Sequence, residues 1–415
     1  MKKFVNVRIK GYDDKTEILV HDGKIKEIAA SIVTDATTEI IDLDGKMIVP
    51  PYVDPHLHLD YVFTANMGEQ NGSGTLFEGI QRWSESKGNT SIEDMKERIY
   101  KGIKKEMLQG VQAIRTHIDV TDPSFTGLKA ALEVKEELKD NLDLQIVAFP
   151  QEGMYAYKGG AELVEEALKM GADCVGAIPH FELAREFGEK SIYKTVELAA
   201  KYNKLIDVHC DETDDTQSRF LELLNALVTM EDIGAKTSAS HTCSFGSADN
   251  SYAFRMMKLL KKSGINFISC PTENIYLQGR QDTYPKRRGL TRVKELNDNG
   301  INVCFAQDSM SDPWYPLGNG NMMMILDHGI HIAQMMSPRE IKNALDLVTI
   351  NGAKAMSLNE YGIEVGKPAN FIVLDATNEF DAICERAACI ASVRNGDFVF
   401  RKTPATINMV TSFWK

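Results

Sequence analysis

The sequence predicts an α/β fold, a parallel (β/α)8 barrel of the TIM type, joined to a small β domain. Two observations predict the barrel: short apolar runs recur along the middle of the chain, and stretches with helical periodicity separate most of them. A doubly wound sheet shows the same alternation, but eight runs in succession favour closure. The runs cover residues 47–49, 112–114, 144–149, 174–178, 205–208, 237–240, 265–269 and 301–305.

The two ends of the chain differ from this middle part. Residues 5–9, 17–20 and 24–28 resemble short strands, and so do residues 371–374, 390–393 and 398–401. Glycine, proline, asparagine and aspartate separate these runs, as expected of turns. We therefore expect one small β-sandwich domain formed by residues 1–49 and 362–415, and a hydrolase barrel formed by residues 50–361.

Composition excludes several classes of function. The chain has 415 residues, of which 43% are hydrophobic and 26% are charged, and its net charge is -12. An acidic chain is a poor match for nucleic acid, and we expect no membrane partner because the sequence lacks a long apolar segment. Seven cysteines without a C-x-x-C pair indicate reduced thiols in a cytoplasmic protein. The expected ligand is a small, uncharged or weakly basic molecule.

Histidines gather at the ends of the apolar runs. The chain has nine histidines, and a single histidine is more often a structural residue than a ligand. The carboxyl ends of the strands line the active site of a barrel of this type. Six histidines at these ends therefore favour a functional site: His56, His58, His117, His180, His209 and His241.

The pair His56 and His58 is the strongest local signal. Side chains two residues apart on a strand point to the same side, so both imidazoles can bind one ion. A catalytic metal site needs about three protein ligands and an open position. His209 after the fifth run and Asp308 after the eighth can complete it, and this donor set suits zinc and iron alike.

Two further residues are candidates for proton transfer. Glu212 lies three residues after His209, so it can take a proton from the attacking water and pass it to a nitrogen; the alternative is a surface glutamate in an acidic loop. His241 can hydrogen-bond the water or the developing oxyanion, or act as a fourth nitrogen ligand. The fourth run ends in Ile178-Pro179-His180 without the bridging lysine that binuclear hydrolases commonly carry, which predicts a single metal ion.

With this arrangement the sequence resembles the amidohydrolase superfamily, and more narrowly the bacterial cytosine deaminases. The similarity covers nearly the whole chain and is carried by segments 73–80, 149–153, 176–182, 207–212, 282–289 and 312–318.

The resemblance implies a role for each matching residue. His56, His58, His209 and Asp308 would hold one divalent ion, Zn²⁺ or Fe²⁺. Glu212 would carry protons to the ring nitrogen, His241 would polarise the attacking water, and Asp308 would take part in catalysis as well as in metal binding. Gln151 would hydrogen-bond the amide edge of the ring and Trp314 would pack near it. By the same analogy we expect a homo-oligomer.

The end of the eighth run departs from the cytosine deaminase pattern. Members of that family usually have His-Asp-Asp there, and this chain has Gln307-Asp308-Ser309. Ser309, an expected substrate contact, removes a carboxylate and some volume, which predicts a less charged and roomier pocket. The substrate therefore stays open between cytosine, giving uracil and ammonia, and creatinine, giving N-methylhydantoin and ammonia. Isoguanine and 5-substituted cytosines are the next candidate substrates.

Two other classes of function remain as alternatives. A ring-opening cyclic amidase would use similar ligands, but typically with two metal ions. A non-catalytic binding or assembly protein on the same scaffold would tend to lose ligands, and none of the expected ligands is missing from this sequence.

Overall fold

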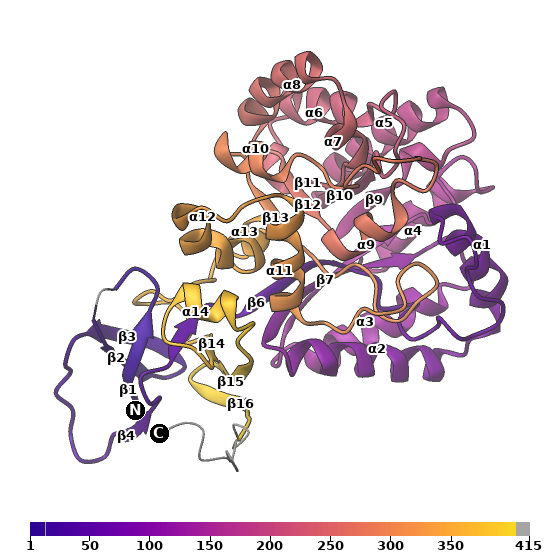
Figure 1. The fold of residues 1–415 in the computed structure, drawn as a ribbon. Helices are drawn as coiled ribbons and strands as arrows, with labels where there is room; N and C mark the ends of the chain where they lie inside the picture. The colour runs from indigo at the N-terminus through magenta and orange to yellow at the C-terminus, as the bar shows by residue number, and fades with distance from the viewer. Residues whose placement is uncertain (13, 404–415) are drawn as a thin grey trace, which may run out of the picture. The chain divides into compact units, whose positions relative to one another are not determined.

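The computed structural model describes residues 1–12 and 14–403. Within it the chain divides into two compact units (Figure 1). One unit is Tyr52–Asn359, and the other combines Met1–Pro51 with the chain from Glu360 onward.

The larger unit is a parallel barrel. Its strands pair with one another in chain order. A bridge between Leu57 and Asp308 joins the end of the last strand to the first, with hydrogen bonds from His58 N to Asp308 O (3.2 Å) and from Asp308 N to His56 O (2.8 Å). The predicted (β/α)8 barrel is thus confirmed. Its strands are β6 (Tyr52–Leu57), β7 (Val111–Asp119), β8 (Asp143–Phe149), β9 (Cys174–Ala177), β10 (Leu205–Cys210), β11 (Thr237–His241), β12 (Asn266–Ser269) and β13 (Val303–Phe305).

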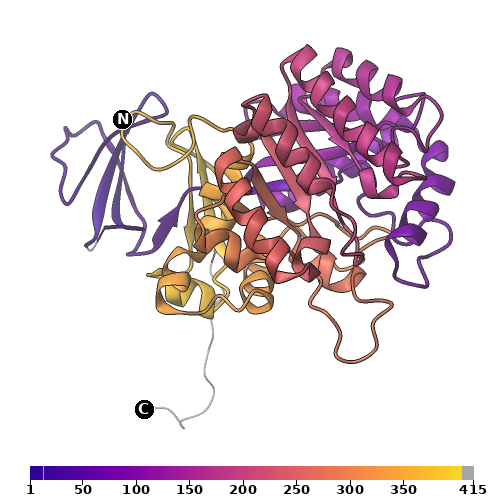
Figure 2. The same ribbon diagram turned by 90° about the horizontal axis from the view of Figure 1, so that it is seen from above.

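Amphipathic helices follow most of the strands and lie outside them (Figures 1 and 2). In α2 the buried residues Met95, Ile99 and Ile103 recur every four positions, and Ser91 caps the helix by accepting from Asp94 N. The outer helices are α2 (Ile92–Met107), α3 (Thr126–Leu138), α4 (Gly160–Met170), α5 (Arg185–Tyr202), α6 (Phe220–Met230), α8 (Asn250–Ser263), α10 (Val293–Asp298), α11 (Met322–Ile332) and α13 (Ile350–Ala355).

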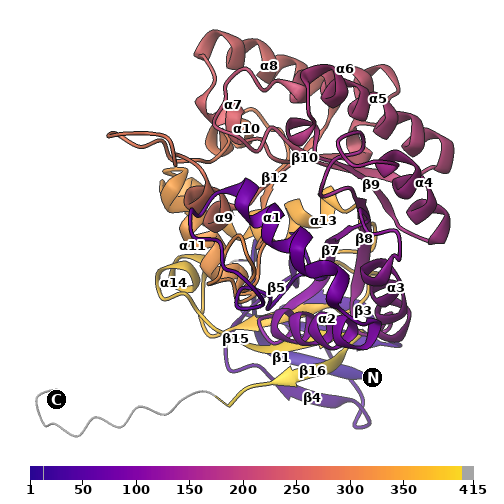
Figure 3. The same ribbon diagram turned by 90° about the vertical axis from the view of Figure 1, so that its right-hand side faces the viewer.

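Two further helices belong to the loops that follow strands. Helix α1 (Leu76–Ser86) comes after β6, and α9 (Pro271–Leu277) comes directly after β12. Figure 3 shows α1 in front of the barrel strands. These loop helices carry residues toward the carboxyl ends of the strands, where barrel enzymes place their sites.

The first barrel strand differs from the prediction. The run 47–49 forms β5 (Met47–Val49), which belongs to the smaller unit, and the barrel begins with Tyr52–Leu57. This strand contains Pro55, which the sequence suggests is a turn residue. The pairing of β6 with β7 shifts register between Asp54 and Leu57, and a proline without an N–H group is tolerated at such an irregularity.

The smaller unit contains a second sheet built from both ends of the chain, as predicted. Its strands from the two chain ends are β1 (Lys2–Ile9), β2 (Thr16–His21), β3 (Lys24–Ala29), β14 (Phe371–Leu374), β15 (Cys389–Arg394) and β16 (Asp397–Arg401). The strand order is β16-β15-β14-β5-β1-β2-β3, and β4 (Glu39–Asp42) pairs with β1. In Figure 2 these strands are indigo and yellow, the colours of the two chain ends. Residues from both ends share one core, among them Phe4, Ile18 and Phe371.

The cysteines and the helices bear on disulfide formation and on membrane-spanning character. All seven cysteines are free thiols. Among the described residues, no helix combines the length and the apolar character that crossing a bilayer requires.

Candidate active site

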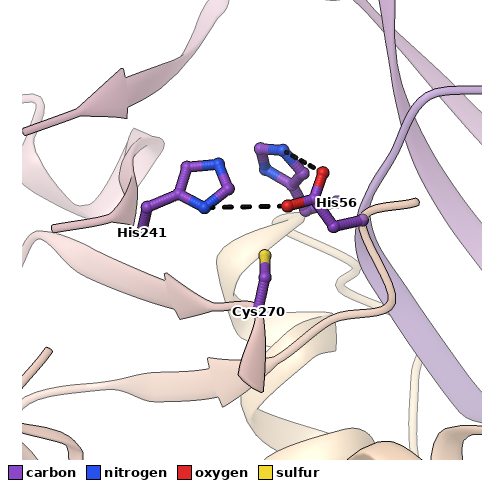
Figure 4. Close-up of side chains that lie close together, drawn as sticks. His56, His241 and Cys270 are labelled. Carbon is purple, nitrogen blue, oxygen red and sulfur yellow. Dashed lines mark ion pairs between the residues drawn. The ribbon is translucent and has the colours of Figure 1, made fainter. Parts of the chain in front are cut away.

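Three imidazoles and one carboxylate converge at the carboxyl end of the barrel. His209 Nε2 lies 3.2 Å from His56 Nε2 and 3.1 Å from His58 Nε2. Asp308 Oδ1 lies 3.5 Å from His56 Nε2 and 3.4 Å from His58 Nε2. All four side chains are buried. The dashed lines of Figure 4 mark the ion pairs of His56 and of His241 with this carboxylate, and Cys270 lies near them.

This cluster has the geometry and the chemistry of a metal site. In a tetrahedral zinc site, metal–nitrogen distances of about 2.0–2.1 Å put neighbouring nitrogens about 3.3–3.4 Å apart, close to the spacing seen here. Burial and the neighbouring imidazoles hold the pKa values of His56 and His209 well below the usual range, so both rings are neutral and offer lone pairs. The residues present therefore fit a divalent cation.

A chain of hydrogen bonds fixes the tautomer of His56. Arg115 Nη1 donates to Asp207 Oδ2 (2.8 Å), and Ser240 Oγ donates to Asp207 Oδ1 (2.6 Å). Because the single Ser240 hydroxyl proton is used there, Ser240 accepts from His56 Nδ1–H at 2.9 Å. The lone pair of His56 is then on Nε2, directed at the other imidazoles. Such outer partners orient metal-ligating histidines in proteins.

Two other groupings in the same region are less suited to a cation. His56, His241, Cys270 and Asp308 form one of them. Burial and the Asp308 carboxylate raise the pKa of the Cys270 thiol well above its usual value, so the thiol keeps its proton. His56 also approaches Asp207 together with His117, but Asp207 is already neutralised by Arg115.

Glu212 and His241 lie beside the cluster and share one partner. Asn274 Nδ2 is 3.3 Å from Glu212 Oε1 and 3.1 Å from His241 Nδ1. Glu212 Oε1 is also 3.4 Å from His241 Nδ1. Burial raises the pKa of Glu212 to about 8. A carboxyl group with this pKa can both accept and release a proton near neutral pH.

A narrow pocket opens beside these groups. Trp314 packs on Tyr61 with ring centroids 4.4 Å apart, and its indole N–H donates to Leu76 O at 3.2 Å. Among the described residues, Gln151 Oε1 has no hydrogen-bond partner although it is buried. The pocket is lined by His58, Tyr61, Leu76, Gln151, Ile178, His209, Glu212, Glu273, Asp308, Ser309 and Trp314.

The structure therefore brings the expected site residues into one region. His58, His209, Glu212, Asp308, Gln151, Ser309 and Trp314 line the pocket, and His56 and His241 contact that group from the side.

Sequence reasoning missed Glu273 and Asn274. Both belong to α9, which follows β12, the seventh barrel strand. They come shortly after the apolar run 265–269, just as the other site residues follow their own runs. This position in the sequence could have identified both as candidate site residues. The Glu273 carboxyl group lines the pocket and hydrogen-bonds Ser309, so a carboxyl group remains beside the position where serine removes one.

Known proteins resemble this chain over nearly its whole length. The Amidohydrolase family model matches residues 39–400. The structure of 5-methylcytosine deaminase from Klebsiella pneumoniae, liganded with 5-fluorocytosine, is similar with a TM-score of 0.95 and 49% sequence identity, covering 98% of this chain and 99% of that chain.

Among the curated relatives, N-isopropylammelide isopropyl amidohydrolase from Pseudomonas sp. (strain ADP) is 28% identical over 95% of this chain and 96% of its own length. Pterin deaminase from Rhizobium rhizogenes is 26% identical over 94% of this chain and 89% of its own length.

Proposed function

The chain belongs to the amidohydrolase family and is a hydrolase that acts on C–N bonds; on that premise we propose that it deaminates cytosine and cytosines substituted at C5. One observation carries the proposal: His56, His58, His209 and Asp308 converge beside Glu212 in a single narrow pocket. The similarity to 5-methylcytosine deaminase supports the choice of ring.

In this proposal His56, His58, His209 and Asp308 hold one divalent ion, Zn²⁺ or Fe²⁺. When bound, the ion acts as a Lewis acid and supplies an activated water at neutral pH. Neutral imidazoles and one carboxylate are the donors that both metals accept. The bridging lysine of binuclear sites is absent from the sequence after the fourth strand, which supports a single ion.

Glu212 is the proposed proton carrier. The water oxygen bonds to the ring carbon that bears the amino group, and Glu212 carries one water proton to the ring nitrogen. The second water proton passes to the exocyclic nitrogen as its bond to the ring carbon breaks, so that this nitrogen leaves as ammonia and a carbonyl group forms on the ring. The pKa of Glu212, about 8, suits a group that must hold and release this proton. His241 polarises the attacking water, and Asn274 holds both side chains in place through its amide.

The pocket walls fit a flat pyrimidine. Gln151 offers an unpaired carbonyl oxygen to the amide edge of the ring, and the Trp314 and Tyr61 rings form an apolar wall. Ser309 has a small side chain at the position where cytosine deaminases usually carry aspartate, which leaves space for a substituent at C5. Creatinine stays a prediction from the sequence alone.

The test is a paired substrate assay. We expect the protein loaded with Zn²⁺ or Fe²⁺ to release ammonia from cytosine and from 5-methylcytosine, with uracil and thymine as the products. Mass spectrometry of the product separates deamination from ring opening. Absence of ammonia release from both pyrimidines, with metal bound, would contradict the proposal.

Glu212→Gln is the matched control. This variant keeps the size of the side chain but removes its ability to carry a proton. We expect it to bind the metal as the wild type does and to lose turnover by about 100-fold or more. Full activity in the variant would refute the proton-carrying role.

A further inference from the structure

We propose that Glu273 contacts the substrate and accepts a hydrogen bond from the amino group on the carbon under attack. The inference rests on the proposed function, and it adds a residue that selects an amino-bearing ring.

The position of Glu273 indicates a ligand contact. Its side chain lines the pocket together with Ser309 and Trp314, and the residue is only 2% exposed. Its Oε2 atom is buried and has no hydrogen-bond partner in the part of the chain that the structure describes. A buried polar atom without a partner is unfavourable, and a donor on a bound ring would satisfy it.

The order of the strands in the barrel determines which edge of the bound pyrimidine Glu273 contacts. Gln151 follows β8, the third barrel strand, and Glu273 follows β12, the seventh. The third and seventh strands lie opposite each other in an eight-stranded barrel, so the two side chains approach the pocket from opposite walls. Glu212 follows the fifth strand, between them. A pyrimidine with its amide edge at Gln151 and its ring nitrogen at Glu212 directs its amino group to the wall of Glu273.

The chemistry of this wall suits the amino group of the substrate. A carboxyl group offers an acceptor oxygen whether or not it carries a proton. The carboxyl groups of Asp308, Asp312 and Glu212 neighbour Glu273, so this side of the pocket is rich in acceptor oxygens for an N–H donor.

The experiment compares two rings that differ only in the amino group. Cytosine and 2-pyrimidinone share the amide edge, and 2-pyrimidinone lacks the amine. Affinities are measured by calorimetry in metal-loaded Glu212→Gln protein, where turnover is blocked. Adding Glu273→Met should weaken cytosine binding by about 10- to 100-fold and leave 2-pyrimidinone binding unchanged. Adding Glu273→Gln, which keeps an acceptor oxygen, should preserve most of the cytosine affinity.

Thr272→Val is the matched control. Thr272 is a buried neighbour on the same helix, and its hydroxyl has no hydrogen-bond partner among the described residues. We expect this change to leave both affinities unchanged. An equal loss for both rings in Glu273→Met would assign Glu273 a structural role and overturn the inference.

Wild-type activity separates the two proposals. If the wild type deaminates cytosine but Glu273→Met does not alter the ratio of the two affinities, the inference fails while the deaminase proposal stands. If the wild type turns over neither cytosine nor 5-methylcytosine, the deaminase proposal fails, and the inference fails with it.

Discussion

His56 shows how one residue depends on partners that the local sequence does not reveal. Its Nδ1 atom contacts Ser240, which belongs to β11, and Ser240 contacts Asp207 on β10. Arg115 on β7 neutralises Asp207. Three strands therefore determine which nitrogen of a single imidazole faces the candidate metal site.

Replacing Ser240 tests this chain. In Ser240→Ala the His56 ring loses the acceptor that fixes its tautomer, and we expect metal affinity to fall by about 10- to 100-fold. Competition with a chelator of known affinity measures the change. Ser238→Ala is the control, because Ser238 accepts from Arg115 at 3.1 Å on the same strand. If both variants bind metal as the wild type does, these hydrogen bonds do not orient His56 for metal binding.

Backbone conformation is also unusual at single site residues. His241 has φ 66° and Asp308 has φ 68°, in the left-handed region that residues other than glycine seldom adopt. His241 is the last residue of β11, and Asp308 lies three residues beyond the end of β13. Strained backbone of this kind persists where the surrounding structure enforces it, and it is frequent at functional sites.

At the scale of elements, α1 supports one wall of the pocket through a glycine. A Cβ atom on Gly79 would lie 2.4 Å from Trp314 Nε1 and 2.5 Å from its Cδ1. The helix and the indole can therefore approach this closely only with glycine at this position. Leu76, at the start of the same helix, accepts the indole N–H.

Gly79→Ala should displace Trp314. Alanine favours a helix over glycine by about 1 kcal/mol, so α1 itself should form at least as well. We expect the indole to shift and the KM for cytosine to rise by about tenfold, the effect of about 1.4 kcal/mol, with metal content unchanged. Gly88→Ala serves as the control, since nothing lies within 4 Å of a Cβ at Gly88. Equal KM values in the two variants would contradict the proposed support.

At the scale of the barrel, Arg115 joins several elements from the inside. Its guanidinium is fully buried and donates to Asp207, Gln145 and the backbone oxygen of Ala355. These partners belong to β10, β8 and α13. A buried charge is tolerated only when it is paired and hydrogen-bonded, and Arg115 fulfils both conditions.

Arg115→Met should destabilise the protein because Asp207 then stays buried without its partner. We expect the free energy of unfolding to fall by about 3–5 kcal/mol, measured by urea denaturation. The double variant Arg115→Met/Asp207→Asn removes the unpaired charge and should recover part of the loss. A single variant as stable as the wild type would show that this ion pair does not hold the barrel together.

The sequence by itself determined the class of the fold and the residue types of the site. Alternating apolar runs and helical stretches follow from burial of the strands inside a ring of helices, so the pattern is visible along the chain. His56, His58, His209 and Asp308 could be named because each lies at or just beyond the end of such a run. The terminal sheet was also predictable, since both ends show strand-like alternation.

Tertiary structure decided where the barrel begins and which partners complete the site. The first strand contains Pro55, and only its irregular pairing with β7 shows that a proline fits there. Glu273 and Asn274 become site residues because α9, which directly follows β12, places Glu273 in the pocket lining and Asn274 against His241. Barrel closure through His56, His58 and Asp308 brings together residues about 250 positions apart. Contacts between residues so far apart in the sequence depend on pairing between distant strands, and no local sequence pattern predicts them.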